Sequence, residues 1–289
     1  MCTRAPRLEI GPWSHGRKNC DGEDKSGRGR RSGCVNILRW SRVLLLSSLL
    51  VSLAYAPLTK GEKELSVDEV IARNTEATGG RAAIEAVKAI AVELHIVDPG
   101  FEVDGTYQAA RPGRMRIDVM AKGKRVFVEA FDGKRGWQWN GKGDTPVDAS
   151  AKAAAALQRG VEMPGKLYGL HELAGRGHKV ELAGREKIEG VDYYALKVTF
   201  SDGYLITFYV DPATWLITRR RDVRALHVDV DPTPTTIEQR SSDFRKVNGV
   251  MFAFHGEEVD LQNGKVLETT TVKEIRVNPP VDEAIFEKL

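Results

Sequence analysis

The chain has 289 residues with 43 basic and 40 acidic side chains, which gives a formal net charge of +3. Ten of the basic and four of the acidic residues fall in residues 1–56, so the remainder carries 33 basic and 36 acidic residues. The remainder is mildly acidic, which excludes net charge as an argument for nucleic-acid binding. All three cysteines, Cys2, Cys20 and Cys34, also lie in the first part, so the rest depends on apolar burial and not on disulfides.

Two segments precede the predicted folded region. Residues 1–34 are rich in Gly, Arg and Lys and poor in aliphatic residues, so we expect them to be disordered or untranslated, with Val35 as the true start. Residues 35–56 have the order of a secretory signal peptide: a short basic segment, an apolar run too short for a membrane span, and small residues. We expect cleavage near Ala54 or Ala56 and export to the periplasm.

Three helices are predicted in residues 57–289, which we expect to form a single domain. The first runs from Ser66 to about Thr78 and begins with a capping box, in which Ser66 and Glu69 satisfy each other's backbone N–H groups. A second short helix covers residues 81–88 after a Gly-Gly pair, and an alanine-rich third helix covers residues 150–161.

Strands make up almost all of the rest. Turn sequences such as Pro-Gly, Asp-Gly and Asn-Gly separate them at intervals of about ten residues, which predicts an antiparallel meander. The expected strands are Ala89 to Val97, Glu102 to Arg111, Arg114 to Ala121, Arg125 to Phe131, Arg135 to Asn140, Lys179 to Lys187, Tyr193 to Phe200, Tyr204 to Val210, Trp215 to Val228, Thr235 to Lys246, Val250 to Leu261 and Lys265 to Val277.

The hairpin in residues 203–221 is the most informative part of the meander. Tyr204, Ile206 and Phe208 share one face of its first strand, and the opposite face is nearly as apolar. We therefore expect a core or a ligand on one side of this strand and a cover on the other. Asp211 and Pro212 close the turn, because Pro212 presets φ and the Asp211 carboxylate accepts backbone N–H groups.

The predicted fold is mainly β: a curled antiparallel sheet of about 11–12 strands that forms an incomplete barrel, with a few helices on its concave side. A sheet of this size curls, and one side of the curl has to be filled. The three predicted helices are too small to fill that side densely. The sequence therefore predicts a ligand cavity there.

Four segments, in this order, carry a resemblance to a known family. They are the helix that ends in Thr78-Gly79-Gly80, Tyr209 to Ile217, Asp243 to Val250, and Val277 to Phe286. Together they resemble the bacterial LolA/LolB-like superfamily, which includes periplasmic carriers and sensors of lipids and lipoproteins. The resemblance implies an incomplete antiparallel barrel around helices, with a hydrophobic cavity. The chain departs from the pattern at Ala253, where many relatives have Pro, and at Trp215, where Gly is common.

An acyl-chain cavity needs apolar and aromatic side chains, which offer large contact areas. Trp137 and Trp139 share one strand face, and the full set of candidate lining residues is Phe127, Phe131, Trp137, Trp139, Tyr204, Ile206 and Phe208. Ordinary core positions are the competing interpretation. Arg219 and Arg221 also share a strand face and are candidates for a lipid headgroup or an acidic partner. A solvated or edge-blocking face is the alternative for these two arginines.

Motifs for catalysis and cofactors are absent from the sequence: there is no GxSxG, no P-loop, no GxGxxG between a strand and a helix, and no cysteine nucleophile. His227, Asp229 and Asp231 fall on one face of a predicted strand, but no second histidine nearby completes a metal site. We therefore predict no enzymatic activity, no cofactor and no metal.

Together these features predict a periplasmic monomer that binds a lipid or the acyl chains of a lipoprotein, as carrier or chaperone. A protein of the inner or outer membrane is a further expected partner. The alternative is an envelope-stress sensor or assembly module that uses the sheet as a protein-interaction surface. A hydrolase hidden on the same scaffold is the third hypothesis.

Overall fold

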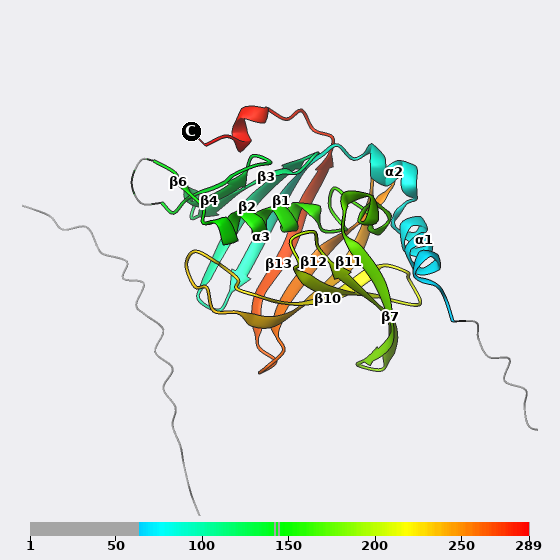
Figure 1. The fold of residues 1–289 in the computed structure, drawn as a ribbon. Coiled ribbons are helices and arrows are strands. Elements are labelled where there is room, and N and C mark those ends of the chain that lie inside the picture. Colours follow the sequence, from blue (N-terminus) through cyan, green and yellow to red (C-terminus); the bar gives the residue numbers. More distant parts are fainter. Residues whose placement is uncertain (1–63, 142, 144, 289) are drawn as a thin grey trace, which may run out of the picture. The chain divides into compact units, whose positions relative to one another are not determined.

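The computed structural model describes residues 64–141, 143 and 145–288, so the predicted leader and signal peptide lie outside the described residues. The described part forms one antiparallel sheet with three α-helices, α1 (Val67–Thr78), α2 (Arg81–Ala86) and α3 (Ala151–Glu162) (Figure 1). The predicted capping box opens α1: the hydroxyl of Ser66 accepts from the Glu69 N–H at 3.2 Å, and the Ser66 N–H donates to the Glu69 carboxylate at 2.7 Å. None of these helices is long and apolar enough to cross a membrane.

The sheet contains thirteen strands within the described residues. They are β1 (Ala89–Asp98), β2 (Phe101–Ala110), β3 (Arg114–Ala121), β4 (Lys124–Phe131), β5 (Gly136–Trp139), β6 (Val147–Asp148), β7 (Lys179–Ile188), β8 (Val191–Thr199), β9 (Leu205–Val210), β10 (Ile217–Arg224), β11 (Thr235–Val247), β12 (Val250–Asp260) and β13 (Val266–Val277). Strands β1–β6 and β7–β13 are two meanders joined by the β1–β13 pair, and β6 and β7 are the two edges. The sheet is curled but not closed, which confirms the predicted incomplete barrel.

Among the differences between the predicted strands and the structure, two concern β6 and the start of β10. Strand β6 is only two residues long, too short for a period-two pattern to show it. Strand β10 starts at Ile217 because Trp215 has a left-handed backbone, with φ of 60°. The Trp215 ring stacks on Tyr194 with the centroids 5.2 Å apart, and the Arg73 guanidinium lies 4.6 Å from its centroid. These contacts hold a bulky residue in a conformation that normally favours glycine.

Residue alternation gives the sheet two faces. We call the inner face the one that packs against the three helices and residues 163–177, and the outer face the opposite one. Two apolar clusters fill parts of the inner face. In the first, Phe131 and Phe252 pack with α2 and α3, and in the second, Phe208 packs with α1 and residues 170–173. Helix α3 lies in front of the inner face in Figure 1.

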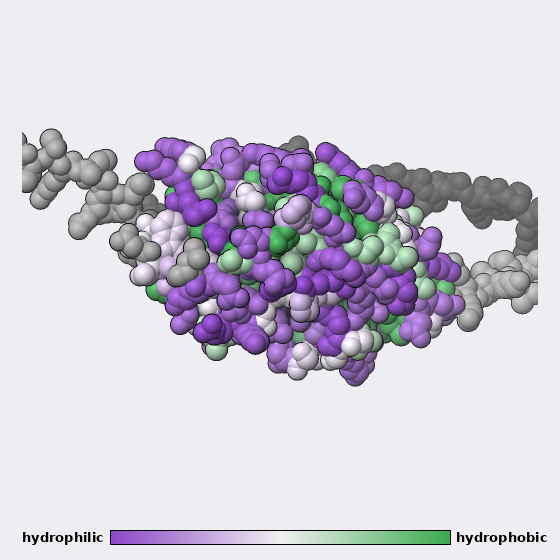
Figure 2. Space-filling model, turned by 90° about the horizontal axis from the view of Figure 1, so that it is seen from above, coloured by the Kyte–Doolittle hydropathy of each residue, from purple (hydrophilic) through white to green (hydrophobic). Residues whose placement is uncertain are grey.

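The C-terminal segment covers part of the outer face. Phe286 packs against Ala89 and Ala110, and its carbonyl accepts a hydrogen bond from the indole N–H of Trp137 at 2.8 Å. Viewed from the side of α2 and the C-terminal segment, the surface is mostly hydrophilic with small hydrophobic areas (Figure 2). The two largest apolar clusters both pack on the inner face.

Candidate ligand-binding site on the inner face

Part of the inner face is apolar but incompletely covered. Leu94, Ile117 and Val272 face this side from β1, β3 and β13, and Leu157 joins them from α3. All four pack against the first apolar cluster, yet all four stay partly exposed. Phe131 in the same cluster is only 3% exposed. The helices therefore leave an apolar area that a ligand can cover, which we call the apolar floor.

Charged side chains occupy the inner face beside the apolar floor. Strand β10 contributes Asp222 and Arg224, and β12 contributes Glu258. The Arg224 guanidinium lies 3.0 Å from the Asp222 carboxylate and 2.5 Å from that of Glu258. The hydroxyl of Tyr204 also donates to Asp222, at 2.5 Å. Arg224 is thus paired with both carboxylates within the fold.

Two cations of the same region, Arg220 and Lys166, form no ion pair within the described residues. Arg220 contacts the sulfur of Met163, and its Nε has no hydrogen-bond partner among the described residues. Burial lowers the pKa of Arg220. The ammonium group of Lys166 lies 4.2 Å from the centroid of the Tyr107 ring. Burial and then the positive charge of Arg220 lower the pKa of Lys166 to about 8.

Lys166 is exposed to water, although many protein atoms surround its ammonium group. Lys166 is then positioned to meet a ligand on the inner face.

The loop between β10 and β11, residues 225–234, connects the two halves of the sheet. The Asp229 carboxylate accepts from the side-chain amide of Gln138 in β5 at 3.2 Å and from the backbone N–H of Ser150, the N-cap of α3, at 3.0 Å. We call this loop the strap. Burial and the negative charge of Asp229 raise the pKa of the neighbouring Glu129 to about 7.

Helix α3 is held from the other half as well. Arg159 forms an ion pair with Asp202, in the turn between β8 and β9, and its guanidinium lies 4.2 Å from the centroid of the Tyr204 ring. The strap and α3 therefore lie together over the inner face (Figure 1).

The predicted lining residues divide between the two faces. Phe131, Ile206 and Phe208 are buried on the inner face, in two separate clusters. Phe127 and Tyr204 face the same side and stay partly exposed. Trp137 and Trp139 share a face, as predicted, but it is the outer face, where they pack with Val128 and Ala130. The seven side chains do not form one wall.

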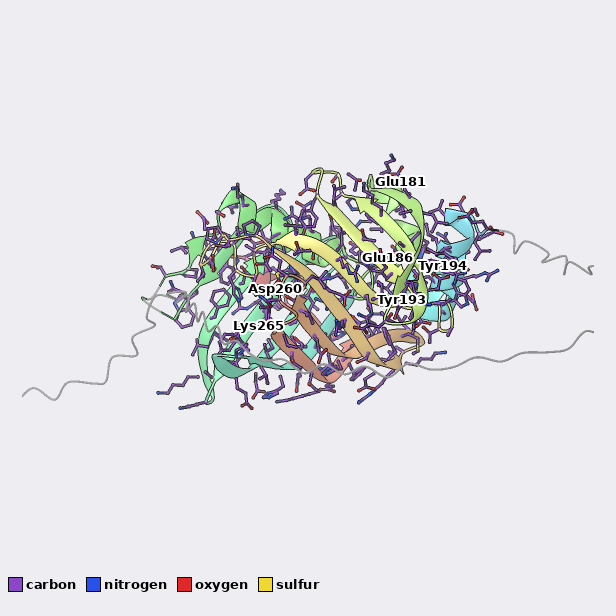
Figure 3. The ribbon with its side chains drawn as sticks, turned by 90° about the horizontal axis from the view of Figure 1, so that it is seen from below. Glu181, Glu186, Tyr193, Tyr194, Asp260 and Lys265 are labelled. Carbon is purple, nitrogen blue, oxygen red and sulfur yellow. The ribbon has the colours of Figure 1, made fainter. Side chains whose placement is uncertain are left out.

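Arg219 and Arg221 lie on the outer face and are already paired. Glu238, only 1% exposed, lies between them, with oxygens 2.6 Å from Arg219 and 2.7 Å from Arg221. Arg221 also lies 2.6 Å from Glu186, whose cross-strand partner is Tyr193 (Figure 3). Arg220, between them, was not among the predicted residues, because only its pairing with Phe208 reveals that it faces inward.

The strand face expected to carry His227, Asp229 and Asp231 does not form. His227, Asp229 and Asp231 lie in the strap and not on a strand, because β10 ends at Arg224. Asp229 instead holds Gln138 and the start of α3. Within the described ranges no group of three or more His, Cys, Asp or Glu side chains is arranged to hold a metal ion.

The outer face carries a separate shallow groove of about 520 Å³. Its most exposed apolar side chains are Leu205 at 51% and Val223 at 58%. The residues that line it are Lys197, Gly203, Tyr204, Leu205, Ile206, Thr207, Arg221, Asp222, Val223 and Thr236. The second apolar face that the sequence showed in β9 thus lines this groove at Leu205 and Thr207.

An open, curled antiparallel sheet with helices on its inner face defines a class of incomplete barrels. No protein-family model and no curated protein matches the sequence. Among solved structures, a LolA superfamily protein from Nitrosomonas europaea aligns with a TM-score of 0.51 and 15% identity, over 78% of this chain and 98% of that one. A DUF1329 family protein from Desulfovibrio piger aligns with a TM-score of 0.53 and 13% identity, over 77% and 97%. The fold is LolA-like.

Proposed function

We propose that this protein binds a lipid, or the acyl chains of a lipoprotein, on its inner face and acts as a periplasmic carrier or chaperone without catalysing a reaction. The apolar floor is the observation that carries this proposal. Leu94, Ile117, Leu157 and Val272 come from four different elements and stay partly exposed on the covered side of the sheet. An acyl chain laid along them shields these side chains from water.

The hydrophobic effect is large enough for useful affinity. Each buried methylene group contributes about 0.8 kcal/mol, so about 15 of them contribute about 12 kcal/mol. Subtracting about 4 kcal/mol for lost freedom on association leaves roughly 8 kcal/mol, which corresponds to a micromolar dissociation constant. Release then requires a partner that moves α3 or the strap, or that competes for the chain. The signal-peptide pattern in residues 35–56 supports the periplasmic location.

The experiment is to express the full chain with its leader, purify the exported protein, and analyse it by native mass spectrometry followed by organic extraction. We expect a bound lipid. Leu157→Lys places a charge on the apolar floor and should abolish the lipid adduct. Val223→Lys, on the outer face, is the matched control and should retain it. A wild-type protein free of lipid would contradict the proposal.

The outer groove favours a second candidate function, an envelope-stress sensor or assembly module that docks a protein. Leu205 and Val223 are exposed apolar side chains beside charged Lys197 and Arg221, which is the composition of a small contact surface. Chemical crosslinking in intact cells distinguishes the two functions. If Val223→Lys removes a crosslinked membrane protein while Leu157→Lys does not, the groove is the functional surface.

A further inference from the structure

We infer that the ligand of the inner face is an anionic amphiphile, whose phosphate or carboxylate head group is bound by Arg220 and Lys166. This inference rests on the proposed function and names the class of ligand. It separates lipids with a negatively charged head from neutral lipids that offer the same acyl chains.

The arginines of β10 provide the first argument. Arg219, Arg221 and Arg224 each have a carboxylate oxygen within 2.6 Å or less. Arg220 has none among the residues that the structure describes, and its nearest polar contact is a thioether sulfur. A guanidinium group presents a fork of N–H donors that fits a phosphate or carboxylate. Three of the four arginines have that partner in the fold, and the inward-facing Arg220 lacks it.

Lys166 provides the second argument. Its ammonium group forms a cation–π contact with Tyr107 and has no carboxylate at ion-pair distance within the described residues. It lies close enough to Arg220 for the two charges to repel, which contributes to the lowered pKa of Lys166. Glu258 acts on both cations from a distance, but neither cation has a carboxylate at ion-pair distance within the described residues. An anion that contacts both of them would offset their repulsion. Solvent reaches Lys166, so a ligand can reach it as well.

The carboxylates of this region are directed elsewhere. Glu258 and Asp222 are paired with Arg224. Glu268 accepts from the Thr270 hydroxyl at 3.0 Å, and burial and the negative charge of Glu258 raise its pKa. None of the three forms an ion pair with Arg220 or Lys166 within the part of the chain that is described. These carboxylates act on the two cations only from a distance, so direct contact with both is left for an anionic group from outside the chain.

The sheet register connects this position to the apolar floor. Tyr107, on which Lys166 lies, is the cross-strand partner of Ile117. On β13, Val272 faces inward four residues beyond Glu268. A head group at Lys166 and Arg220 therefore places its acyl chain on Ile117 and Val272. The cationic pair and the apolar floor form one continuous amphipathic site.

Titration calorimetry with the delipidated full chain tests this inference. The probes are oleoyl lysophosphatidate, oleate and monoolein, which share one acyl chain and differ in head group, together with glycerol 3-phosphate, which has no chain. We expect both anionic amphiphiles to bind about tenfold more tightly than monoolein, or better. Arg220→Gln should remove most of that preference and leave monoolein binding unchanged, and Arg220→Lys should retain part of it.

Arg276→Gln is the matched control, because Arg276 is a half-exposed arginine on the outer face. Circular dichroism verifies that each variant is folded. Equal binding of all three amphiphiles, or a preference that survives Arg220→Gln, would overturn the inference while the proposed function stands. Binding of glycerol 3-phosphate that depends on Arg220, without added affinity from any oleoyl chain, would support the anion site and contradict the lipid function. No binding of any probe would refute both.

Discussion

Neighbouring arginines on β10 are expected to change stability in opposite directions. Arg220→Met removes a partly buried guanidinium that has no carboxylate at ion-pair distance within the described residues, and methionine keeps much of the apolar volume. We expect the free energy of unfolding to rise by about 1–2 kcal/mol, less than for a fully buried charge because Arg220 is partly exposed. Arg221→Met instead removes one of the donors to buried Glu238. We expect a loss of about 2–3 kcal/mol, since the other donors remain.

The assay is thermal and urea unfolding of the lipid-free protein at pH 7, followed by circular dichroism. For a domain of this size, 1 kcal/mol corresponds to roughly 2–4 °C in Tm. Arg220→Met should therefore raise Tm by about 2–8 °C, and Arg221→Met should lower it by about 4–12 °C. An equal loss of stability in both variants would refute the reasoning, because it would mean that Arg220 has a counter-ion in the folded protein. If Arg220→Met is more stable than the wild type but binds anionic ligands more weakly, then Arg220 serves binding at a cost in stability.

Three further predictions concern the core, the strap and pH. Phe208→Ala should lower the free energy of unfolding in urea by about 3–5 kcal/mol, because Phe208 is 1% exposed. Phe127→Ala, at a partly exposed position, should lower it by about 1 kcal/mol and weaken oleate binding. Equal losses in the two variants would contradict this prediction. Asp229→Ala should speed hydrogen exchange in residues 225–234 and accelerate ligand release, and unchanged exchange would show that the strap is held otherwise. The pKa of Glu129 is raised from 4.5 to about 7 in the folded protein. Between these pH values the folded protein retains a proton that the unfolded chain has released. The free energy of unfolding should therefore fall by roughly 2 kcal/mol as the pH rises from about 4.5 to 7. Glu129→Gln should remove that fall, and a variant that kept it would exclude Glu129 as the cause.

Local patterns in the sequence predicted the fold well because they depend on neighbouring residues. The turn at Asp211 is an example: its carboxylate accepts from the N–H groups of Ala213 at 2.7 Å and Thr214 at 3.0 Å, as expected from the sequence alone. Period two also correctly grouped Trp137 with Trp139 and Arg219 with Arg221. The boundaries of α1 and α3 followed from capping residues in the same way.

The site was harder to predict because it depends on contacts between distant strands. Alternation shows which residues share a face, but not which face the helices will cover, so the two tryptophans were assigned to the cavity. The pairing of Arg221 with Glu238 follows from the β10–β11 register, which no local pattern fixes. For the same reason the isolated charge of Arg220 becomes visible only when its neighbours are known. Residues 225–228, the first part of the strap, were predicted as the end of a strand, because the alternation of residues continues beyond Arg224.

The most direct test of acyl-chain binding on the inner face is photo-crosslinking with oleoyl lysophosphatidate that carries a diazirine in its chain, mapped to single residues by tandem mass spectrometry. The expected crosslinks are at Leu94, Ile117, Leu157 and Val272. Crosslinks confined to Leu205 and Val223 in the outer groove, or none above the level of a chain-free diazirine, would contradict binding on the inner face.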